Sequence, residues 1–193
     1  ALEFKKQGYF SLADLASYRV YWREPLMGNY QGWEVITMPP PSSGGLALLQ
    51  FLWGSERKSN TMQEIQGANS YHDFTELARI IYEDRARYLG DPDYMDYASD
   101  ELLDSNYLND RFSVINPEKA GKSPDLLATK SEESMETTHF SILDKEGNAV
   151  SITTTLNASY GSKRWISGFF MNNEMDDFSI SPGVPNQFGL IGF

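Results

Sequence analysis

The stretch Glu136–Asn157, ETTHFSILDKEGNAVSITTTLN, decides how the rest of this sequence is interpreted. Its first part, Thr138–Leu143, largely alternates apolar and polar side chains, as a strand with one apolar face does. Turn-forming residues follow at Asp144–Asn148, where Gly147 can adopt a positive φ. The second part, Ala149–Leu156, is rich in Val, Ile and Thr, which favour strands. The stretch therefore predicts a β-hairpin that opens on paired threonines.

The composition is that of an ordinary globular chain and excludes several classes of function. Of the 193 residues, 40% are hydrophobic and 22% charged, and the formal net charge is −11. Such a charge repels a phosphate backbone and an anionic membrane surface, so we expect no nucleic-acid partner. The absence of cysteine rules out disulfides, thiol catalysis and cysteine-based zinc sites. No apolar run is long enough to cross a bilayer, so we expect no membrane segment in this chain.

The sequence on either side of the hairpin predicts mainly helices. Ser11 and Asp14 form a capping pattern for a helix that ends near Tyr18. A strand is expected over Gly32–Thr37 and must stop at the prolines that follow it. Further helices are expected from Gly45 to about Trp53, over Tyr71–Leu89, and as one or two segments between Ser99 and Phe112. Residues 116–136 are polar and aperiodic, and we interpret them as an exposed linker.

Several other residue patterns do not have the spacing of the binding or catalytic motifs they resemble. Ser42-Ser43-Gly44-Gly45 lacks the Gly-Lys-Ser/Thr ending of a nucleotide loop. Asp91, Asp93 and Asp96 lack the glycine and distal glutamate of a calcium loop, so we interpret them as solvated turn residues. His72 and His139 are not accompanied by a Gly-x-Ser-x-Gly elbow. We therefore expect neither a metal ion nor a cofactor.

Four motifs together resemble those of the γ-glutamyltranspeptidase family. They are MPPPSSGG at residues 38–45, YEDRARYLGDPDY at 82–94, the hairpin with TTHFSILDKEGNAVSITTTLN, and FFMNNEMDDFS followed by PGVPNQFGL at 169–190. The resemblance covers nearly the whole chain. It implies an α+β fold, the αββα sandwich of the N-terminal nucleophile hydrolases, present here only in part. It also implies an enzyme that hydrolyses or transfers γ-glutamyl groups, as in glutathione, to water or to an amino-acid or peptide acceptor.

The resemblance makes Thr137 the nucleophile, and simple chemistry explains why a cleavage must come first. A threonine hydroxyl is a weak nucleophile until a base takes its proton, and an α-amine with a pKa of about 7.7–8.0 can be that base. In the intact chain the nitrogen of Thr137 is part of the amide with Glu136. The family implies autocatalytic cleavage between Glu136 and Thr137. We therefore expect residues 1–136 to be the carboxyl-terminal part of a large subunit, and residues 137–193 the amino-terminal part of a small one.

Other site residues are carried over from the family motifs. Thr155 is expected to orient Thr137 through its hydroxyl. Asn157, Glu174 and Asp177 are expected to bind the substrate, the two carboxylates taking its ammonium group. Residues 182–190 are expected to begin a lid in which Phe188 replaces a tyrosine found in many members, so the lid should be held less tightly.

The resemblance also implies what this chain lacks. The family's carboxylate-binding arginine lies upstream of it, and the paired serines and Gly-Gly oxyanion site lie beyond Phe193. Because loss of one oxyanion donor costs about 100- to 1,000-fold in rate, we expect this chain alone to be inactive. Its partners are then γ-glutamyl compounds and the remainder of its own subunits. Family members are commonly exported, which implies a periplasmic or secreted protein.

Two alternatives remain open. The first is a β-lactam side-chain acylase of the same superfamily, although a substrate without an ammonium would leave Glu174 and Asp177 unpaired. The second is a non-catalytic, β-rich binding module in which the threonines serve only the sheet.

Overall fold

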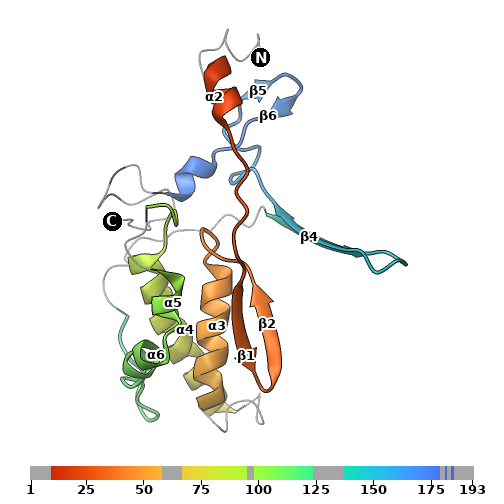
Figure 1. Cartoon of the computed structure of the whole chain (residues 1–193). Coiled ribbons are helices and arrows are strands. Elements are labelled where there is room, and N and C mark those ends of the chain that lie inside the picture. The colour runs from red at the N-terminus through yellow and green to blue at the C-terminus, as the bar shows by residue number, and fades with distance from the viewer. Residues whose placement is uncertain are drawn as a thin grey trace.

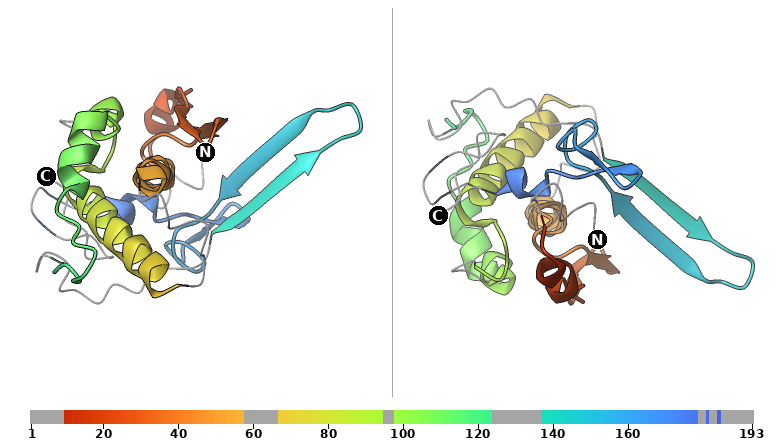
Figure 2. Two further views of the ribbon diagram at one scale, coloured as in Figure 1. Left: turned by 90° about the horizontal axis from the view of Figure 1, so that it is seen from below. Right: turned by 90° about the horizontal axis from the view of Figure 1, so that it is seen from above.

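The computed structural model describes residues 10–57, 67–94, 98–123, 137–178, 181 and 184. A body of helices carries one β-hairpin along its side, and a second, longer hairpin projects away from it (Figure 1). The two views of Figure 2 show the same projection from below and from above. Among the described residues, no helix combines the length and apolar character needed to cross a membrane.

The first hairpin packs against the longest apolar helix of the amino-terminal half. Strand β1 (Leu26–Tyr30) pairs antiparallel with β2 (Trp33–Thr37), and α3 (Gly44–Arg57) lies beside both. Leu26 is buried together with Leu46 and Leu49 of α3. Before β1, the short helix α2 (Leu12–Ser17) is capped by Ser11, whose hydroxyl accepts a hydrogen bond from the backbone N–H of Asp14.

The main core lies between α3 and two later helices, α4 (Ala68–Tyr88) and α6 (Ser105–Phe112). The short helix α5 (Ser99–Leu102) instead adds Leu102 to the cluster around Leu26. Leu77, Ile80 and Ile81 of α4 are each at most 3% exposed, and such burial is worth about 1.5–3 kcal/mol per side chain. At Gly54, an added Cβ would lie 2.6 Å from a methyl of Leu77, so a glycine allows α3 and α4 to approach closely.

A buried ion pair joins α4 to α6. Asp84 has a side chain only 2% exposed, and its Oδ1 lies 2.6 Å from Nη2 of Arg111. Burial raises the pKa of Asp84, whereas the hydrogen bonds and charge supplied by Arg111 and Tyr107 lower it. Removing one partner of such a pair would leave the other charge buried without compensation. The pair therefore fixes the way α6 packs on α4.

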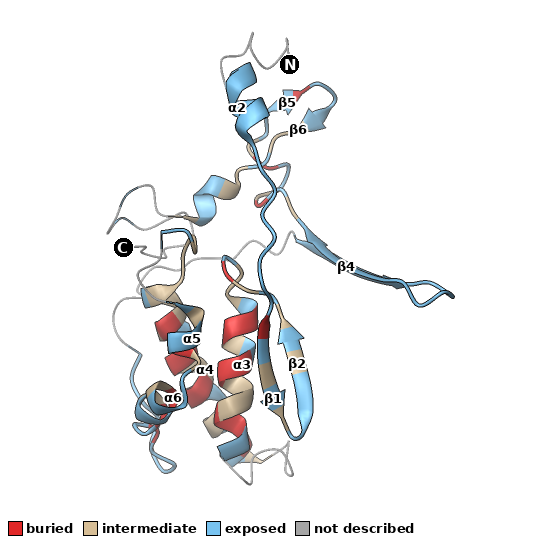
Figure 3. Ribbon diagram, viewed as in Figure 1, coloured by how far each residue is buried: buried red, intermediate tan, exposed pale blue. Residues whose placement is uncertain are grey.

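The second hairpin is built as predicted but is not buried. Strand β3 (Thr138–Leu143) pairs with β4 (Ala149–Thr154) in six antiparallel positions, and Gly147 in the turn has a φ of +85°. Val, Ile and Thr suit a pleated and partly buried surface, but all twelve strand residues are exposed in this chain. Figure 3 shows the buried residues gathered on the helical body and the hairpin exposed along its length.

Most predicted elements are confirmed, with several differences. Helix α3 continues to Arg57, and the strands over Leu26–Tyr30, Trp165–Ile166 and Phe169–Phe170 and the short helix over Glu174–Asp177 were not predicted. Helical spacing places Phe74, Leu77, Ile81 and Tyr82 on the apolar face of α4. Leu77 and Ile81 are buried, but Phe74 and Tyr82 are more than half exposed, and Glu76 and Asp84 are buried instead. The reason is that both acids have arginine partners, which makes their burial possible.

Candidate functional site

The open end of the β3–β4 hairpin brings Thr137 and Thr155 opposite each other. Thr138 pairs with Thr154 in the observed register, so the next position places Thr137 across from Thr155. Directly opposite residues in an antiparallel pair have Cβ atoms about 4.5–5.5 Å apart. Thr137 is exposed and Thr155 is half-buried. This is the juxtaposition that a nucleophile and an orienting hydroxyl require.

A hydrogen-bonded row of polar side chains continues along the same face of the hairpin. His139 is two residues after Thr137, and its Nδ1 lies 2.8 Å from Oγ1 of Thr153. Its Nε2 lies 3.2 Å from Oγ of Ser151 and 3.4 Å from Oγ of Ser141. Phe140, Ile142, Val150 and Ile152 occupy the opposite face, while Leu143 and Ala149 follow the polar row on its own face. His139 is therefore hydrogen-bonded to both strands of the hairpin.

Asn157 connects the end of the hairpin to the acidic segment. Its backbone N–H donates to Oγ1 of Thr155 at 2.9 Å, and its side-chain amide donates to the carbonyl of Asn173 at 3.0 Å. The residue is 8% exposed and has a φ of +71°. Asparagine tolerates this left-handed conformation better than most residues do. The chain can thus turn sharply just after Thr155 and approach residues 172–177.

A small loop joins the end of the hairpin to the acidic segment, and hydrogen bonds close this loop at its base. Strands β5 (Trp165–Ile166) and β6 (Phe169–Phe170) form its tip, and Ile166 is fully buried. Asn173 holds its base, because its side-chain oxygen accepts a hydrogen bond from the N–H of Ala158 at 3.0 Å. The backbone N–H of Asn173 also donates to the carbonyl of Leu156 at 3.2 Å. These bonds set the position of the acidic residues that follow.

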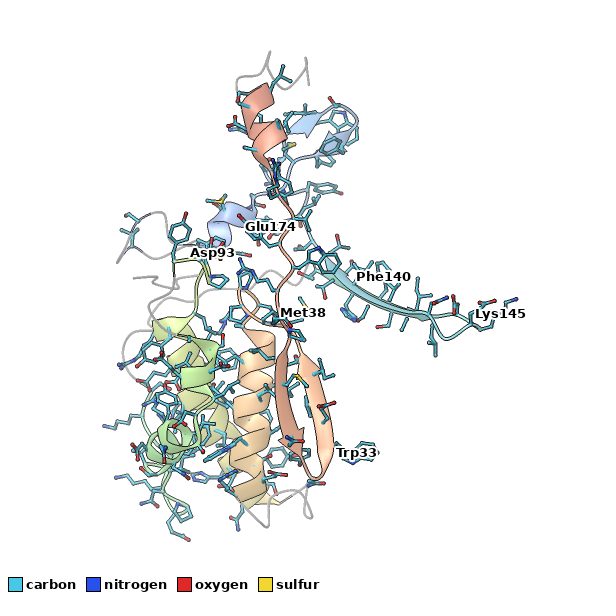
Figure 4. The ribbon with its side chains drawn as sticks, in the orientation of Figure 1. Trp33, Met38, Asp93, Phe140, Lys145 and Glu174 are labelled. Carbon is cyan, nitrogen blue, oxygen red and sulfur yellow. The ribbon has the colours of Figure 1, made fainter. Side chains whose placement is uncertain are left out.

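Glu174 and Asp177 lie within η2 (Glu174–Asp177), and each carboxyl group affects the pKa of the other. Partial burial raises the pKa of Glu174, and the charge of Asp177 raises it further. The pKa of Asp177 is also raised, first by loss of water around its carboxyl group and then by Asp176, while Glu174 and Arg85 oppose the shift. Two carboxyl groups so close favour a cation, which relieves their repulsion. Figure 4 shows Glu174 near the base of the hairpin, with Phe140 and Lys145 farther out along it.

The start of the predicted linker is exposed but held by α4. Residues 116–123 are all exposed. Glu76 nevertheless accepts a hydrogen bond from the N–H of Gly121 at 2.9 Å, and Arg79 donates to the carbonyl of Lys122 at 3.2 Å. The remainder of the linker with Glu136, and the predicted lid with Phe188 apart from residue 184, lie outside the described residues.

The structure thus brings the predicted residues together in two groups. Thr137 and Thr155 form one, and Glu174 and Asp177 form the other, while Asn157 joins them through Asn173. Sequence reasoning missed Asn173, although the Asn-Asn doublet before the acidic run was a visible signal. It also missed the charge that α4 supplies at Asp177 through Arg85. No pattern within α4 points to a residue so far away in the sequence.

Comparison with known proteins decides the family. The family model described as gamma-glutamyltranspeptidase matches residues 2–192. This chain belongs to the γ-glutamyltranspeptidase family. The glutathione hydrolase proenzyme of Pseudomonas aeruginosa is 43% identical over 190 residues, which cover 96% of this chain and 34% of that protein. The chain therefore spans about a third of the length of the curated relatives it matches, among them the Escherichia coli proenzyme at 39% identity.

Solved structures of the γ-glutamyltranspeptidase family and of a related acylase share its fold. The Helicobacter pylori γ-glutamyltranspeptidase matches with a TM-score of 0.57 and 36% identity, over 63% of this chain and 35% of that one. A cephalosporin acylase from Bacillus halodurans matches with a TM-score of 0.72 and 25% identity, over 98% of this chain and 33% of the acylase. The predicted fold class, part of an N-terminal nucleophile hydrolase, is confirmed.

Proposed function

We propose that this chain is part of a longer proenzyme that becomes a γ-glutamyltransferase and glutathione hydrolase after self-cleavage between Glu136 and Thr137. The observation that carries the proposal is the placement of Thr137 opposite Thr155, next to a segment that ends in paired carboxyl groups. The curated relatives support it, because they are described as glutathione hydrolase proenzymes. We also propose, from the family alone, that the parent protein is periplasmic or secreted.

The proposed mechanism begins within the precursor. The hydroxyl of Thr137 attacks the carbonyl of Glu136, the peptide nitrogen leaves, and an ester links the two residues. Water hydrolyses this ester and releases Thr137 with a free α-amine. That amine can then take the hydroxyl proton when Thr137 attacks the γ-carbonyl of a substrate. Thr155 would accept or donate a hydrogen bond at the same hydroxyl and orient it for attack.

Substrate binding follows from the other group of residues. Glu174 and Asp177 would bind the α-ammonium of a γ-glutamyl compound, with Asn157 beside them. The γ-glutamyl group is transferred to Thr137 and the amine of the donor leaves, for example the cysteinylglycine part of glutathione. Water or the amine of an amino acid or peptide then attacks the γ-glutamyl ester and restores Thr137. No metal or cofactor has a role in this scheme.

The full-length protein provides the test. Mass spectrometry of the purified wild type should give two pieces separated between Glu136 and Thr137, and the cleaved protein should hydrolyse L-γ-glutamyl-p-nitroanilide. Thr137→Ala should remove both the cleavage and the turnover. Thr138→Ala is the matched control, because Thr138 points to the other face of the hairpin, and it should retain both. An uncut Thr137→Ala protein with wild-type turnover would refute the proposal.

A second candidate function is supported by the acylase fold match. An acylase acting on the side chain of a β-lactam would use the same nucleophile on a substrate without an ammonium group. Comparing hydrolysis of L-γ-glutamyl-p-nitroanilide with that of a glutaryl-linked β-lactam separates the two. Preference for the glutaryl substrate would favour the acylase, because only the γ-glutamyl group has the ammonium that Glu174 and Asp177 can bind.

A further inference from the structure

Asn173 connects the end of the β3–β4 hairpin to the residue before η2. Its backbone N–H donates to the carbonyl of Leu156 at 3.2 Å, and its Oδ1 accepts from the N–H of Ala158 at 3.0 Å. Its own carbonyl accepts from the side-chain amide of Asn157 at 3.0 Å. One asparagine therefore holds three consecutive residues at the end of the hairpin, among them the predicted substrate-binding residue Asn157.

The same side chain also holds part of the acidic segment. Nδ2 of Asn173 donates to Oδ2 of Asp176 at 2.8 Å, and the backbone N–H of Asp176 donates to the carbonyl of Asn173 at 2.9 Å. A backbone N–H, such as that of Ala158, can only donate, and an ionised carboxylate can only accept. Asn173 thus satisfies both partners in one orientation of its amide, with the oxygen toward the hairpin and the nitrogen toward η2.

The geometry of η2 places its acidic side chains on different sides. In a 3₁₀ helix, side chains three residues apart eclipse each other. Glu174 and Asp177 have this spacing and so lie on one side, whereas Asp176 lies on another, where Asn173 binds it. Burial and then the charge of Asp177 raise the pKa of Glu174, as expected of two neighbouring carboxyl groups. One of the three carboxyl groups is therefore committed to Asn173, and the other two form a pair.

We propose that Asn173 is a positioning residue for donor binding: by tying Asp176 to the end of the hairpin, it presents Glu174 and Asp177, and not Asp176, to the substrate ammonium. This inference rests on the proposed function and deepens it. Asn173 contacts no reacting atom in this scheme. Its change should therefore weaken binding of the γ-glutamyl donor and leave the chemical step nearly unchanged.

The experiment measures kcat and KM separately for L-γ-glutamyl-p-nitroanilide hydrolysis by the self-cleaved, full-length protein. Asn173→Asp keeps the size of the side chain and the oxygen that accepts from Ala158. It cannot donate to Asp176, however, and it brings a second negative charge against that residue. Its KM should rise about tenfold, with kcat within about twofold of wild type.

Exchanging the two residues should rescue binding. In the double variant that combines Asn173→Asp with Asp176→Asn, the amide nitrogen at position 176 can donate to the carboxylate at position 173. The hydrogen bond and the total charge are then both retained, so KM should lie within about threefold of wild type. Such recovery shows that the two positions act as a pair, because independent effects would add.

Asn148→Asp is the matched control. In the turn of the β3–β4 hairpin, Nδ2 of Asn148 donates to Oδ2 of Asp144 at 2.7 Å, so the same change removes the same kind of hydrogen bond. This turn is far from η2, as the positions of Lys145 and Glu174 in Figure 4 show. Asn148→Asp should leave both kcat and KM close to their wild-type values.

Each outcome decides the inference. A KM for Asn173→Asp equal to that of wild type, a loss confined to kcat, or an equal rise of KM in Asn148→Asp overturns it. If Asn173→Asp does not self-cleave because it fails to fold, the double variant decides: self-cleavage with a KM within threefold of wild type supports the inference, and any other result overturns it. A wild-type protein without any turnover refutes the proposed function and this inference with it, whereas an active wild type with an unaffected Asn173→Asp refutes only the role of Asn173.

Discussion

Asn157 meets two requirements at one position. Its backbone adopts a positive φ and its side chain is buried with a hydrogen bond to the carbonyl of Asn173. A glycine could adopt the positive φ but would lack the side-chain hydrogen bond. A glutamine would supply the side-chain amide but would adopt the positive φ less readily. The residue thus determines both the direction of the chain after Thr155 and its distance from the acidic segment. This explains how a motif residue expected to bind substrate also maintains the shape of the site.

The pKa values of Glu174 and Asp177 predict how donor binding depends on pH. Both pKa values are raised in the folded protein. As the pH rises above about 4, an unfolded chain releases the protons of these two groups, while the folded protein without substrate still holds them. The pair therefore contributes less stability as the pH rises through the raised values. A bound ammonium reverses this preference, because it stabilises the ionised carboxylates. Donor binding should release a proton and weaken in acid.

Glu174→Gln tests that prediction in the full-length protein. Glutamine supplies an oxygen but cannot be protonated, so the acid side of the kcat/KM profile should move to lower pH. At pH 5 the variant should keep about three times more of its neutral-pH value than wild type does. Glu146→Gln, in the exposed hairpin turn, is the control and should leave the profile unchanged. Superimposable profiles for wild type and Glu174→Gln would show that the pair does not govern acid loss.

At the residue scale, the sequence predicted the candidate site residues better than it predicted the interactions that position them. The opposition of Thr137 and Thr155 follows from period-two alternation once the hairpin register is known, and the hairpin was readable from its turn residues. The charge of Arg85 lowers the pKa of Asp177 across 92 residues of sequence, and only tertiary structure brings the two within range.

The loop of β5 and β6 is the element that sets the distance between Asn157 and the acidic segment. Its base closes tightly at Gly161, whose φ is +56°. A Cβ added there would meet the carbonyl oxygen of Met171 and lie 2.9 Å from Cα of Asn172. At the tip, Gly168 also has a positive φ, +96°, but an added Cβ would meet nothing within 4 Å. A substitution at Gly168 would therefore add backbone strain alone, whereas one at Gly161 would add a steric clash as well.

Gly161→Ala should displace residues 172–177 and weaken donor binding, whereas Gly168→Ala should not. Both changes impose the left-handed conformation on an alanine, at a cost of about 1–2 kcal/mol. Only Gly161→Ala also pushes Asn172 away, so its KM for the γ-glutamyl donor should rise about threefold to tenfold. Steady-state kinetics of the two self-cleaved variants measure the difference. Equal KM values would mean that the closure of this loop does not position Glu174 and Asp177.

Helix α4 shows where element-level reasoning from sequence succeeds and where it stops. Its length and its ending were predictable from spacing and from the Gly-Asp-Pro that follows. The buried face was predicted only in part: Leu77 and Ile81 are buried as their spacing indicates, but hydrophobic spacing ignores Glu76 and Asp84. Each of these acids is buried with an arginine, Arg79 and Arg111. Arg79 is visible three residues away on the same helix, but Arg111 comes from α6, so its pairing depends on tertiary packing.

Across the whole molecule, the hydrophobic core and the β3–β4 hairpin are separate. Both core clusters are formed by residues between Leu26 and Ile115. The hairpin instead exposes an apolar face made of Phe140, Ile142, Val150 and Ile152. An isolated two-stranded hairpin is at best marginally stable in water. The family's sandwich would cover this face, and the chain spans only about a third of the length of its curated relatives.

This separation predicts the pattern of amide hydrogen exchange in the 193-residue chain. Amides of α4 around Leu77 and Ile81 should exchange slowest, because opening them disrupts the main core. The β1–β2 hairpin is a matched comparison for β3–β4, since it too has two strands but rests on α3 through Leu26. Amides of β3–β4 should exchange about tenfold or more faster than those of β1–β2. In the full-length protein the difference should shrink as the sandwich covers the apolar face. Equal protection of both hairpins in the short chain would contradict the view that packing, rather than strand pairing, stabilises these elements.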